Sequence, residues 1–189
     1  MRPALLASLL AAALVALAAL VPPAAVAADT PTPKVIKGSG AASSPEKIRW
    51  TELGAGLAEA KRTGRPLLVD VQTDWCGWCR KMEKTTYADA AVREYLGRTF
   101  VVSRVDAEDD ESRVDYGGAS RTHRQFADSF RISGYPTTLF FAADGSLVTQ
   151  VPGYVKPDQF LVVLRYIGDG HYRTMSWDAW QRAAAPDAP

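Results

Sequence analysis

The chain has 189 residues, of which 47% are hydrophobic and 23% are charged, the composition of one globular domain rather than of a disordered or fibrous protein. Its 22 basic and 21 acidic residues leave a formal charge of +1, with no basic block that could follow a phosphate backbone, so we expect no nucleic-acid partner. Two cysteines are too few for a disulfide-stapled scaffold and two short of a four-thiolate zinc site.

The first 28 residues have the pattern of an export signal. Arg2 is followed by an apolar run over residues 4–21 that is almost entirely Ala, Leu and Val, and small residues with cleavage-site spacing end at Ala27 and Ala28. We therefore expect a signal peptide over residues 1–28 and a periplasmic or otherwise exported protein. The alternative is a retained membrane anchor, because 18 apolar residues just reach the length that spans a bilayer.

Residues 29–45 are rich in Pro, Gly, Ser and Ala, which predicts a flexible linker. Residues 46–183 are expected to fold as the domain, and residues 184–189 to form a disordered tail. Residues 109–120 show no periodicity, and we expect them to form an exposed excursion from the domain.

The expected elements of the domain alternate between strands and helices. In chain order they are a short strand at 48–50, a helix ending at Gly64, a buried strand at 67–71, a helix capped by Asp89 and ended by Gly97, a strand at 100–105, a helix from about Arg121, a hairpin of 138–141 with 147–151, an amphipathic helix around 160–167, and a helical turn at Trp177 and Trp180. This order predicts an α/β fold with a mixed central sheet covered by helices on both faces.

Two cysteines stand three positions apart where a strand is expected to lead into a helix. Cys76 and Cys79, separated by Gly77 and Trp78, follow closely on the buried-type strand at 67–71. A helix start presents unpaired N–H groups and the positive end of the helix dipole, and both stabilise a thiolate. We expect Cys76 to be the nucleophile, with a pKa below the ~8.5 of a free thiol, and Cys79 to resolve the mixed disulfide.

The cysteine pair has two other interpretations. Half of a zinc site can show this spacing, but the remaining ligands would have to come from His123, His171 and scattered carboxylates. Both histidines are expected to face solvent. A purely structural disulfide is the second alternative, although so short a loop would contribute little conformational entropy.

Asp70 and Pro136 are the other informative residues. An acid inside an apolar strand needs a reason, and a buried Asp70 with a raised pKa could exchange a proton with Cys79 as the disulfide opens and closes. The alternative is an Asp at the exposed end of the strand. Pro136 follows Tyr135 and enters a strand, a position where tight turns and cis bonds occur.

These motifs, taken in order, resemble those of the thioredoxin superfamily. They are Val-Asp at 69–70, Trp-Cys-Gly-Trp-Cys at 75–79 and Gly-Tyr-Pro-Thr at 134–137, and Gly153 matches the family's glycine after the last hairpin. The resemblance spans roughly residues 48–167. It implies that Cys76 is the attacking thiolate and Cys79 the buried resolving thiol, and that Asp70 is the acid that handles the proton.

The resemblance also implies a substrate-binding surface. Pro136 would be the cis-proline that lies against the disulfide, with the backbone of Tyr135 pairing with an extended substrate segment. The residues expected to contact substrate are Trp75, Gly77, Trp78, Tyr135 and Pro136. Arg104 is a candidate basic residue near the buried acid, but no role is assigned to it because the register is not known.

Trp78 replaces the proline usual inside the family motif, so the redox potential cannot be transferred. The chain is similar to exported thioredoxin-like proteins, including those associated with sulfur oxidation and the terminal domain of membrane electron-relay proteins. This implies a thiol:disulfide oxidoreductase that reduces protein or small-molecule disulfides and whose own disulfide is reduced again by a membrane-borne electron donor. We expect no cofactor beyond a Cys76–Cys79 disulfide, no stable metal, and a monomer.

Two further functions remain open. One is the same chemistry in the oxidising or isomerising direction. The other is a binding module that uses the fold to hold a partner or a metal without redox turnover.

Overall fold

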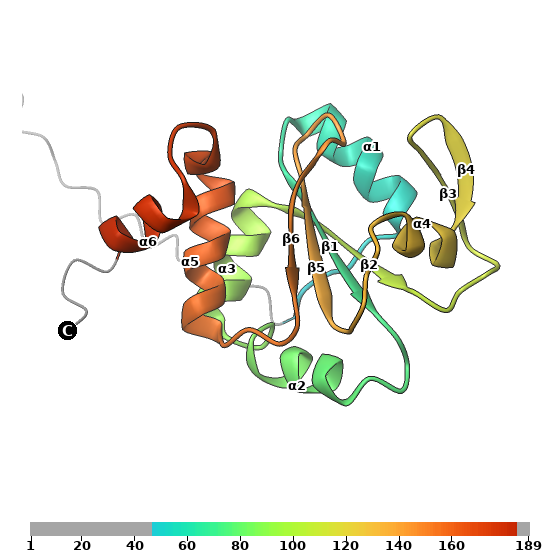
Figure 1. The fold of residues 1–189 in the computed structure, drawn as a ribbon, viewed down its shortest axis with the longest axis horizontal. Coiled ribbons are helices and arrows are strands. Elements are labelled where there is room, and N and C mark those ends of the chain that lie inside the picture. Colours follow the sequence, from blue (N-terminus) through green and yellow to red (C-terminus); the bar gives the residue numbers. More distant parts are fainter. Residues whose placement is uncertain (1–46, 185–189) are drawn as a thin grey trace, which may run out of the picture. The chain divides into compact units, whose positions relative to one another are not determined.

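The computed structural model describes residues 47–184 (Figure 1). The expected signal peptide (1–28) and linker (29–45) lie outside these residues, as do residues 185–189 of the expected tail. The helices are α1 (Leu53–Thr63), α2 (Gly77–Thr85), α3 (Ala90–Thr99), α4 (His123–Ser129), α5 (Pro157–Gly168), the short 3-10 helix η1 (His171–Arg173) and α6 (Trp177–Ala184). The strands are β1 (Leu67–Gln72), β2 (Val101–Asp106), β3 (Arg113–Tyr116), β4 (Ala119–Thr122), β5 (Thr137–Phe141) and β6 (Leu147–Pro152). None of these described helices is long and apolar enough to cross a bilayer.

Four strands form one mixed sheet in the order β2-β1-β5-β6. β1 pairs in parallel with β2, and β5 pairs antiparallel with both β1 and β6. A parallel pair needs a long crossover, which α2 and α3 provide between β1 and β2. The predicted α/β fold with a mixed central sheet is therefore confirmed.

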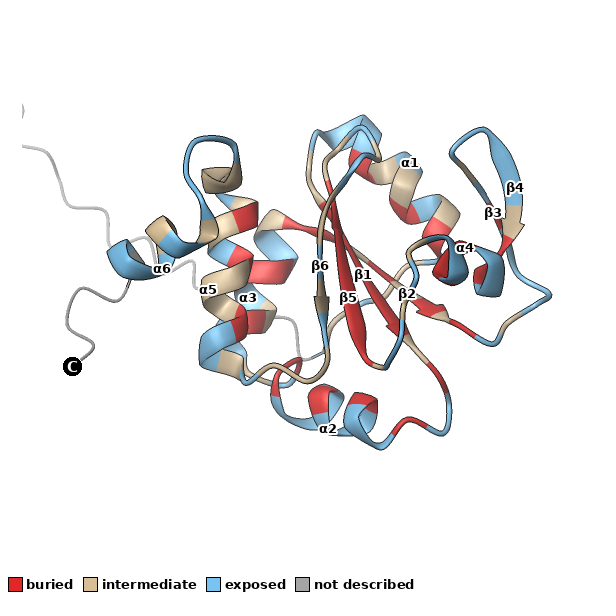
Figure 2. Cartoon of the chain, viewed as in Figure 1, coloured by how far each residue is buried: buried red, intermediate tan, exposed pale blue. Residues whose placement is uncertain are grey.

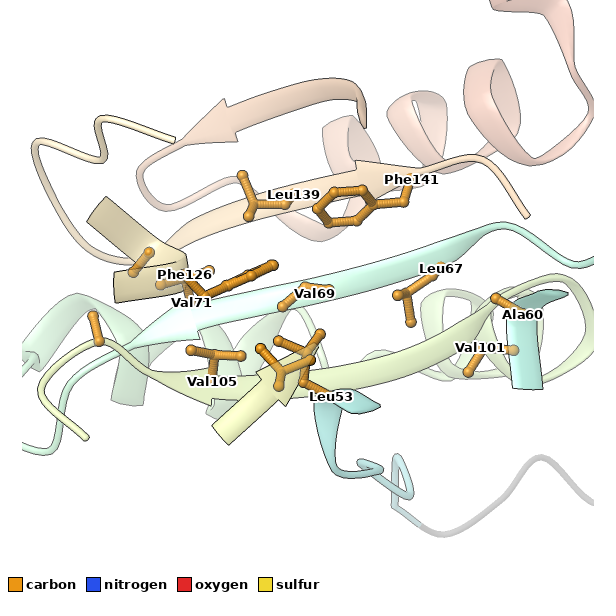
Figure 3. Packing of buried hydrophobic residues seen from close by; sticks show 13 residues of the cluster. Leu53, Ala60, Leu67, Val69, Val71, Val101, Val105, Phe126, Leu139 and Phe141 are labelled. Carbon is orange, nitrogen blue, oxygen red and sulfur yellow. The ribbon is translucent and has the colours of Figure 1, made fainter. Parts of the chain in front are cut away.

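The side chains of β1 alternate between two hydrophobic cores, one on each face of the sheet. Leu67 and Val69 belong to a core with α1 and α4, whereas Leu68 belongs to a core with α2, α3 and α5. Figure 3 shows the first core, with Phe126 of α4 and Phe141 of β5 beside β1. Burial is concentrated in β1 and β5 (Figure 2), and each large apolar side chain buried there contributes about 1.5–3 kcal/mol.

The strand expected at residues 48–50 does not form. Only Thr51 makes a bridge to β2, opposite Ser103, and its hydroxyl donates to Val102 O at 2.8 Å. The next residue, Glu52, already caps α1 by accepting the N–H of Ala55. The chain therefore turns into a helix before a second strand pair can form.

Two expected helix ends are also displaced. α3 continues past Gly97, because the chain leaves the helix only at Phe100, whose ring is 2% exposed and anchors the turn into β2. α4 begins at His123, two residues after the expected start at about Arg121, because the Thr122 side chain caps the helix in a reciprocal capping box. The cap of α3 by Asp89 is confirmed.

Residues 109–120 are mostly exposed, as expected, but they are not without secondary structure, because they contain most of the β3–β4 hairpin. The turn is Gly117-Gly118, with φ of 61° and 78°, a conformation that glycine adopts without a Cβ clash. Val114 is buried, and the ring of Tyr116 packs edge-on against Phe126 with centroids 5.3 Å apart. Strands of four residues are too short to show a clear alternation, which is why the sequence pattern missed them.

His123 was expected to face solvent, and this expectation is wrong. Its side chain is 8% exposed, with Nδ1 3.4 Å from Asp109 Oδ2 and Nε2 3.7 Å from Glu52 Oε1. The segment that leads into the hairpin and the start of α1 together cover it. His171 is half-buried and stacks on Trp180 with ring centroids 4.1 Å apart.

Candidate active site

The two cysteines lie at the start of α2, just beyond the end of β1. Cys76 is the N-cap residue of α2, and its Sγ accepts the backbone N–H of Cys79 at 3.0 Å. Cys76 and Cys79 form a disulfide, with an S–S distance of 2.08 Å and Cα atoms 5.3 Å apart. The chain arrives there through a turn in which Cys76 N donates to Thr73 O at 3.2 Å. A sulfur that caps a helix receives an N–H donor and the positive end of the dipole, and both favour its thiolate once the disulfide is reduced.

One aromatic pair beside the disulfide includes Trp75, which directly precedes Cys76 in the chain. The rings of Trp75 and Tyr135 meet edge-on, with centroids 6.0 Å apart, and 64% of Trp75 is exposed. The Tyr135–Pro136 peptide bond is cis, and Pro136 is buried. Gly153 N donates to Pro136 O at 2.7 Å, which ties the loop before β5 to the loop after β6. The positive φ of 82° at Gly153 explains why a glycine stands there.

A second aromatic pair lies on the side of α2. Trp78, 57% exposed, packs against Tyr154 with ring centroids 5.7 Å apart. Lys81 Nζ lies 4.6 Å from the Trp78 ring and 4.8 Å from the Tyr154 ring. The Tyr154 hydroxyl is 3.2 Å from Thr85 Oγ1, at the end of the same helix. The disulfide is therefore flanked by two aromatic pairs, each made by one exposed tryptophan of the motif and one half-buried tyrosine from a loop at the same end of the sheet.

Asp70 is buried on β1, directly opposite Arg104 in the parallel pairing with β2. Arg104 Nε donates to Asp70 Oδ2 at 2.9 Å, and the Tyr87 hydroxyl donates to Asp70 Oδ1 at 3.2 Å. The Arg104 guanidinium stacks over Trp50, 4.0 Å from the ring centroid, and its other end pairs with Glu83 of α2. The alternative of an exposed Asp70 is therefore wrong.

Burial raises the pKa of Asp70 above its ordinary value, although Arg104 and the two hydrogen bonds oppose the shift. Burial also raises the pKa of Tyr87 well above its ordinary value, and the charge of Asp70 adds to this. Tyr87 therefore stays protonated as a donor. A carboxyl group whose pKa is raised can take up and release a proton under conditions where an exposed aspartate remains ionised.

A polar cavity of about 250 Å³ opens beside the buried sulfur of Cys79. Its lining consists of Gln72, Thr73, Asp74, Cys79, Arg80, Glu83, Lys84 and Arg104. Arg104 borders this cavity together with Cys79, and it also donates a hydrogen bond to Asp70. Arg104 therefore connects the Asp70 carboxyl group to the cavity beside the Cys79 sulfur.

The structure brings most of the predicted site residues together. Cys76, Trp78 and Cys79 lie at the start of α2, and Trp75 directly precedes them in the chain. Tyr135 lies at the same place, because its ring contacts that of Trp75. The other two substrate-contact candidates are Gly77, an exposed residue that opens α2, and Pro136.

Several site residues were missed by the sequence analysis. They are Trp50, Lys81, Glu83, Tyr87 and Tyr154, and Arg104 was considered without a role. The parallel register of β1 and β2 places Arg104 opposite Asp70 and would have identified its role, but a sequence pattern does not specify that register. Within residues 47–184, no three His, Cys, Asp or Glu side chains come together as a metal site.

A mixed four-stranded sheet and a disulfide at the start of the helix after β1 define a thioredoxin-type thiol:disulfide oxidoreductase. The family model for the thioredoxin-like domain matches residues 53–168, so the chain belongs to the thioredoxin-like family.

Curated relatives are thiol:disulfide interchange proteins named DsbD. The Yersinia pestis (strain Pestoides F) protein is 31% identical over 112 residues, 58% of this chain and 17% of the relative. The Ralstonia nicotianae protein is 32% identical over 116 residues, 61% of this chain and 17% of the relative. The matched part of the chain thus spans about a sixth of the length of these relatives.

Solved structures share the fold at lower identity. A thioredoxin-fold protein from Helicobacter pylori has a TM-score of 0.54 and 21% identity, covering 66% of this chain and 81% of that one. A thioredoxin from Thermus thermophilus has a TM-score of 0.52 and 24% identity, covering 69% and 99%.

Proposed function

We propose that the chain is an exported thiol:disulfide oxidoreductase that reduces disulfides of proteins or small molecules in the bacterial periplasm. The observation that carries the proposal is the capping geometry, in which Cys76 Sγ accepts the N–H of Cys79 at the start of α2. The export-signal pattern over residues 1–28 and the similarity to interchange proteins support the location and the reaction class.

In the reducing direction, the dithiol form is the active one. The Cys76 thiolate attacks one sulfur of the substrate disulfide, a mixed disulfide forms, and the first substrate sulfur leaves as a thiolate that takes up a proton. Cys79 then loses its proton and attacks Cys76 Sγ, which releases the second substrate thiolate. The substrate gains two electrons and two protons, and the protein is left with the Cys76–Cys79 disulfide.

Asp70 is proposed to accept the proton of Cys79 in the second step. Its raised pKa, its burial and its link through Arg104 to the cavity beside Cys79 support this role. Trp75, Gly77, Trp78, Tyr135 and Pro136 are proposed to contact the substrate, because Trp75, Gly77 and Trp78 are exposed beside Cys76 in the chain, Tyr135 packs against Trp75, and Pro136 follows Tyr135 through the cis bond.

Each turnover consumes two electrons, so a donor must reduce the disulfide again. We propose a membrane-borne donor of the kind that the similarity to interchange proteins suggests, with no cofactor beyond the two sulfurs.

Trapping tests the proposed chemistry. A Cys79→Ala variant of the full chain should accumulate mixed disulfides through Cys76, because the resolving thiol is absent, and denaturing gels without reductant should show them as adducts that dithiothreitol removes. Cys76→Ser is the matched control and should form none. A Cys79→Ala protein that forms no adducts, or a Cys76→Ser protein that keeps full function in the cell, would instead support a binding module.

Titration of the disulfide in glutathione buffers tests the direction. A reductant should have a potential well below that of a strong oxidant, whose value is about −120 mV. A measured value near that figure would assign the protein to the oxidising direction.

A further inference from the structure

Charged side chains of opposite sign lie near the two aromatic pairs that flank the disulfide. We call Trp78, Tyr154, Lys81 and Lys84 the lysine rim, and Tyr135, Glu108 and Asp128 the acidic rim. The outer surface of α2, which carries much of the lysine rim, is exposed (Figure 2). A substrate segment that reaches the sulfur of Cys76 between the two aromatic pairs would have one rim on each side.

The lysine rim is positive close to the sulfur. Lys81 Nζ lies over both aromatic rings of the rim, at 4.6 Å and 4.8 Å, so its charge lies beside Trp78 although the side chain is exposed. Lys84 and Arg80 border the cavity beside Cys79. Of the two acids that border the same cavity, Glu83 is paired with Arg104, which leaves Asp74 as the opposing charge. Among the described residues, neither lysine is within ion-pair distance of a carboxylate.

The acidic rim is negative. β2 ends at Asp106, opposite the end of β1, so the segment that continues to Glu108 starts at the same end of the sheet as the disulfide. Asp128 lies near the end of α4, close in the chain to Tyr135. After burial, the charges of Asp128 and Glu108 are the largest causes of the raised pKa of the Tyr135 hydroxyl. Arg124 opposes them: its Nε pairs with Asp110 at 2.9 Å, and its other end donates to the backbone carbonyl of Glu108 at 3.0 Å. Asp106 adds a further negative charge, so the acids near Tyr135 outnumber this one cation.

We propose that this charge difference selects and orients the substrate, which is a protein segment with an acidic residue on one side of its disulfide cysteine and a basic residue on the other. The acidic residue lies against the lysine rim and the basic residue against the acidic rim. This inference rests on the proposed function and adds to it the chemical class of the substrate segment. The chain direction of the segment is set by its expected pairing with the backbone of Tyr135, so a segment with the reverse order places like charges together at both rims.

The expected effect is modest, because the charges are exposed and screened. An exposed ion pair changes a rate or binding constant by about 1.5-fold to fivefold. With two rims acting together, we expect a preference of about threefold to tenfold at low ionic strength. At 1 M salt, where the Debye length is about 3 Å, the preference should nearly disappear.

Two peptides of identical composition test the proposal. One has the order Glu-Glu-Ala-Cys-Ala-Lys-Lys and the other Lys-Lys-Ala-Cys-Ala-Glu-Glu, both with blocked ends and both presented as the disulfide with 2-mercaptoethanol. The reduced full chain is mixed with each, and its oxidation is followed through tryptophan fluorescence. Because the net charge is the same, a difference in rate reports charge order alone. A third peptide with glutamine at the four charged positions reports exchange without charge.

We expect one charge order to react about threefold to tenfold faster than the other at low salt. The double variants Lys81→Gln with Lys84→Gln, and Glu108→Gln with Asp128→Asn, should each reduce this preference to below about threefold. Lys61→Gln is the matched control, because Lys61 lies in the last turn of α1, a few residues before β1 begins, whereas the disulfide follows the other end of β1, and it should leave the preference unchanged.

Equal rates for the two charged peptides, with normal exchange of the glutamine peptide, would overturn this inference and leave the proposed function standing. A preference that survives in both double variants would also overturn it. Absence of exchange with all three peptides would overturn the proposed function, and the inference with it.

Discussion

Asp70 and Asp109 each lie close to a basic side chain, yet their pKa values move in opposite directions. Asp70 Oδ2 is 2.9 Å from Arg104 Nε, and Asp109 Oδ2 is 3.4 Å from His123 Nδ1. Burial raises the pKa of Asp70. Hydrogen bonds from the Ser112 side chain and from the backbone N–H groups of Ser112 and Glu111 lower the pKa of Asp109 to about 2.

The difference shows that a neighbouring cation does not by itself set the state of a carboxylate. Asp70 is 3% exposed and loses its hydration, for which one guanidinium and one hydroxyl compensate only in part. Asp109 is 25% exposed, keeps part of its hydration and gains donors from its own loop. Asp70 is therefore suited to exchanging a proton, whereas Asp109 is suited to holding the loop before the hairpin as a permanent anion.

The largest expected effect that tests this contrast is on the rate of exchange. Asp70→Asn should slow resolution of a mixed disulfide on Cys76 about 10-fold to 100-fold near pH 7, because Cys79 loses its proton acceptor. Stopped-flow measurement of that step between pH 6 and 9 should show the deficit shrinking as pH rises and Cys79 ionises unaided. The matched substitution Asp109→Asn should leave the rate within about twofold. Equal rates of mixed-disulfide resolution in Asp70→Asn and the unaltered protein would contradict a proton-transfer role for Asp70.

The second effect is on stability. Arg104→Gln should lower the free energy of unfolding by about 2 kcal/mol at pH 7, because it leaves the Asp70 carboxylate buried without its cation. The cost stays below that of a fully buried pair because Asp70 can become protonated. Denaturant unfolding measures the change. Arg104→Lys is the conservative control and should recover part of the loss. In the background of Asp70→Asn the cost should be smaller, and an equal cost there would contradict the pairing argument.

The smallest effect concerns the other carboxylate. Asp109→Asn should lower the free energy of unfolding by about 1 kcal/mol at neutral pH, through the lost charge-assisted hydrogen bonds of a partly exposed group. Since the pKa of Asp109 is lowered from 3.8 to about 2, its contribution is complete above pH 3.8 and is lost as pH falls through about 2.

Asp70 has the opposite pH dependence. Its raised pKa means that the folded state loses stability as pH rises from 3.8 through the folded pKa, and Asp70→Asn abolishes this loss. Unfolding measured against pH should therefore show the two variants departing from the unaltered protein in opposite senses. Departures of the same sign would contradict the comparison.

Most of the architecture could be predicted from local patterns. The apolar run of β1, the cap at Asp89 and the turn before β6 each depend on neighbouring residues, and all were located within a few positions. The β3–β4 hairpin was not, because four-residue strands on a Gly-Gly turn have too few alternating positions to be recognised. Burial of His123 depends on that hairpin segment and on α1, and it was missed for the same reason.

The sequence alone determined where most of the strands and helices lie and that two cysteines stand at the start of a helix, because these features follow from the order and spacing of nearby residues. Only the tertiary structure decided that Arg104 lies opposite Asp70, that Trp75 and Trp78 each pair with a tyrosine from a distant loop, and that the two rims of the disulfide differ in charge. These contacts join residues tens of positions apart, and the strand register that creates them is selected by packing of the two cores as a whole.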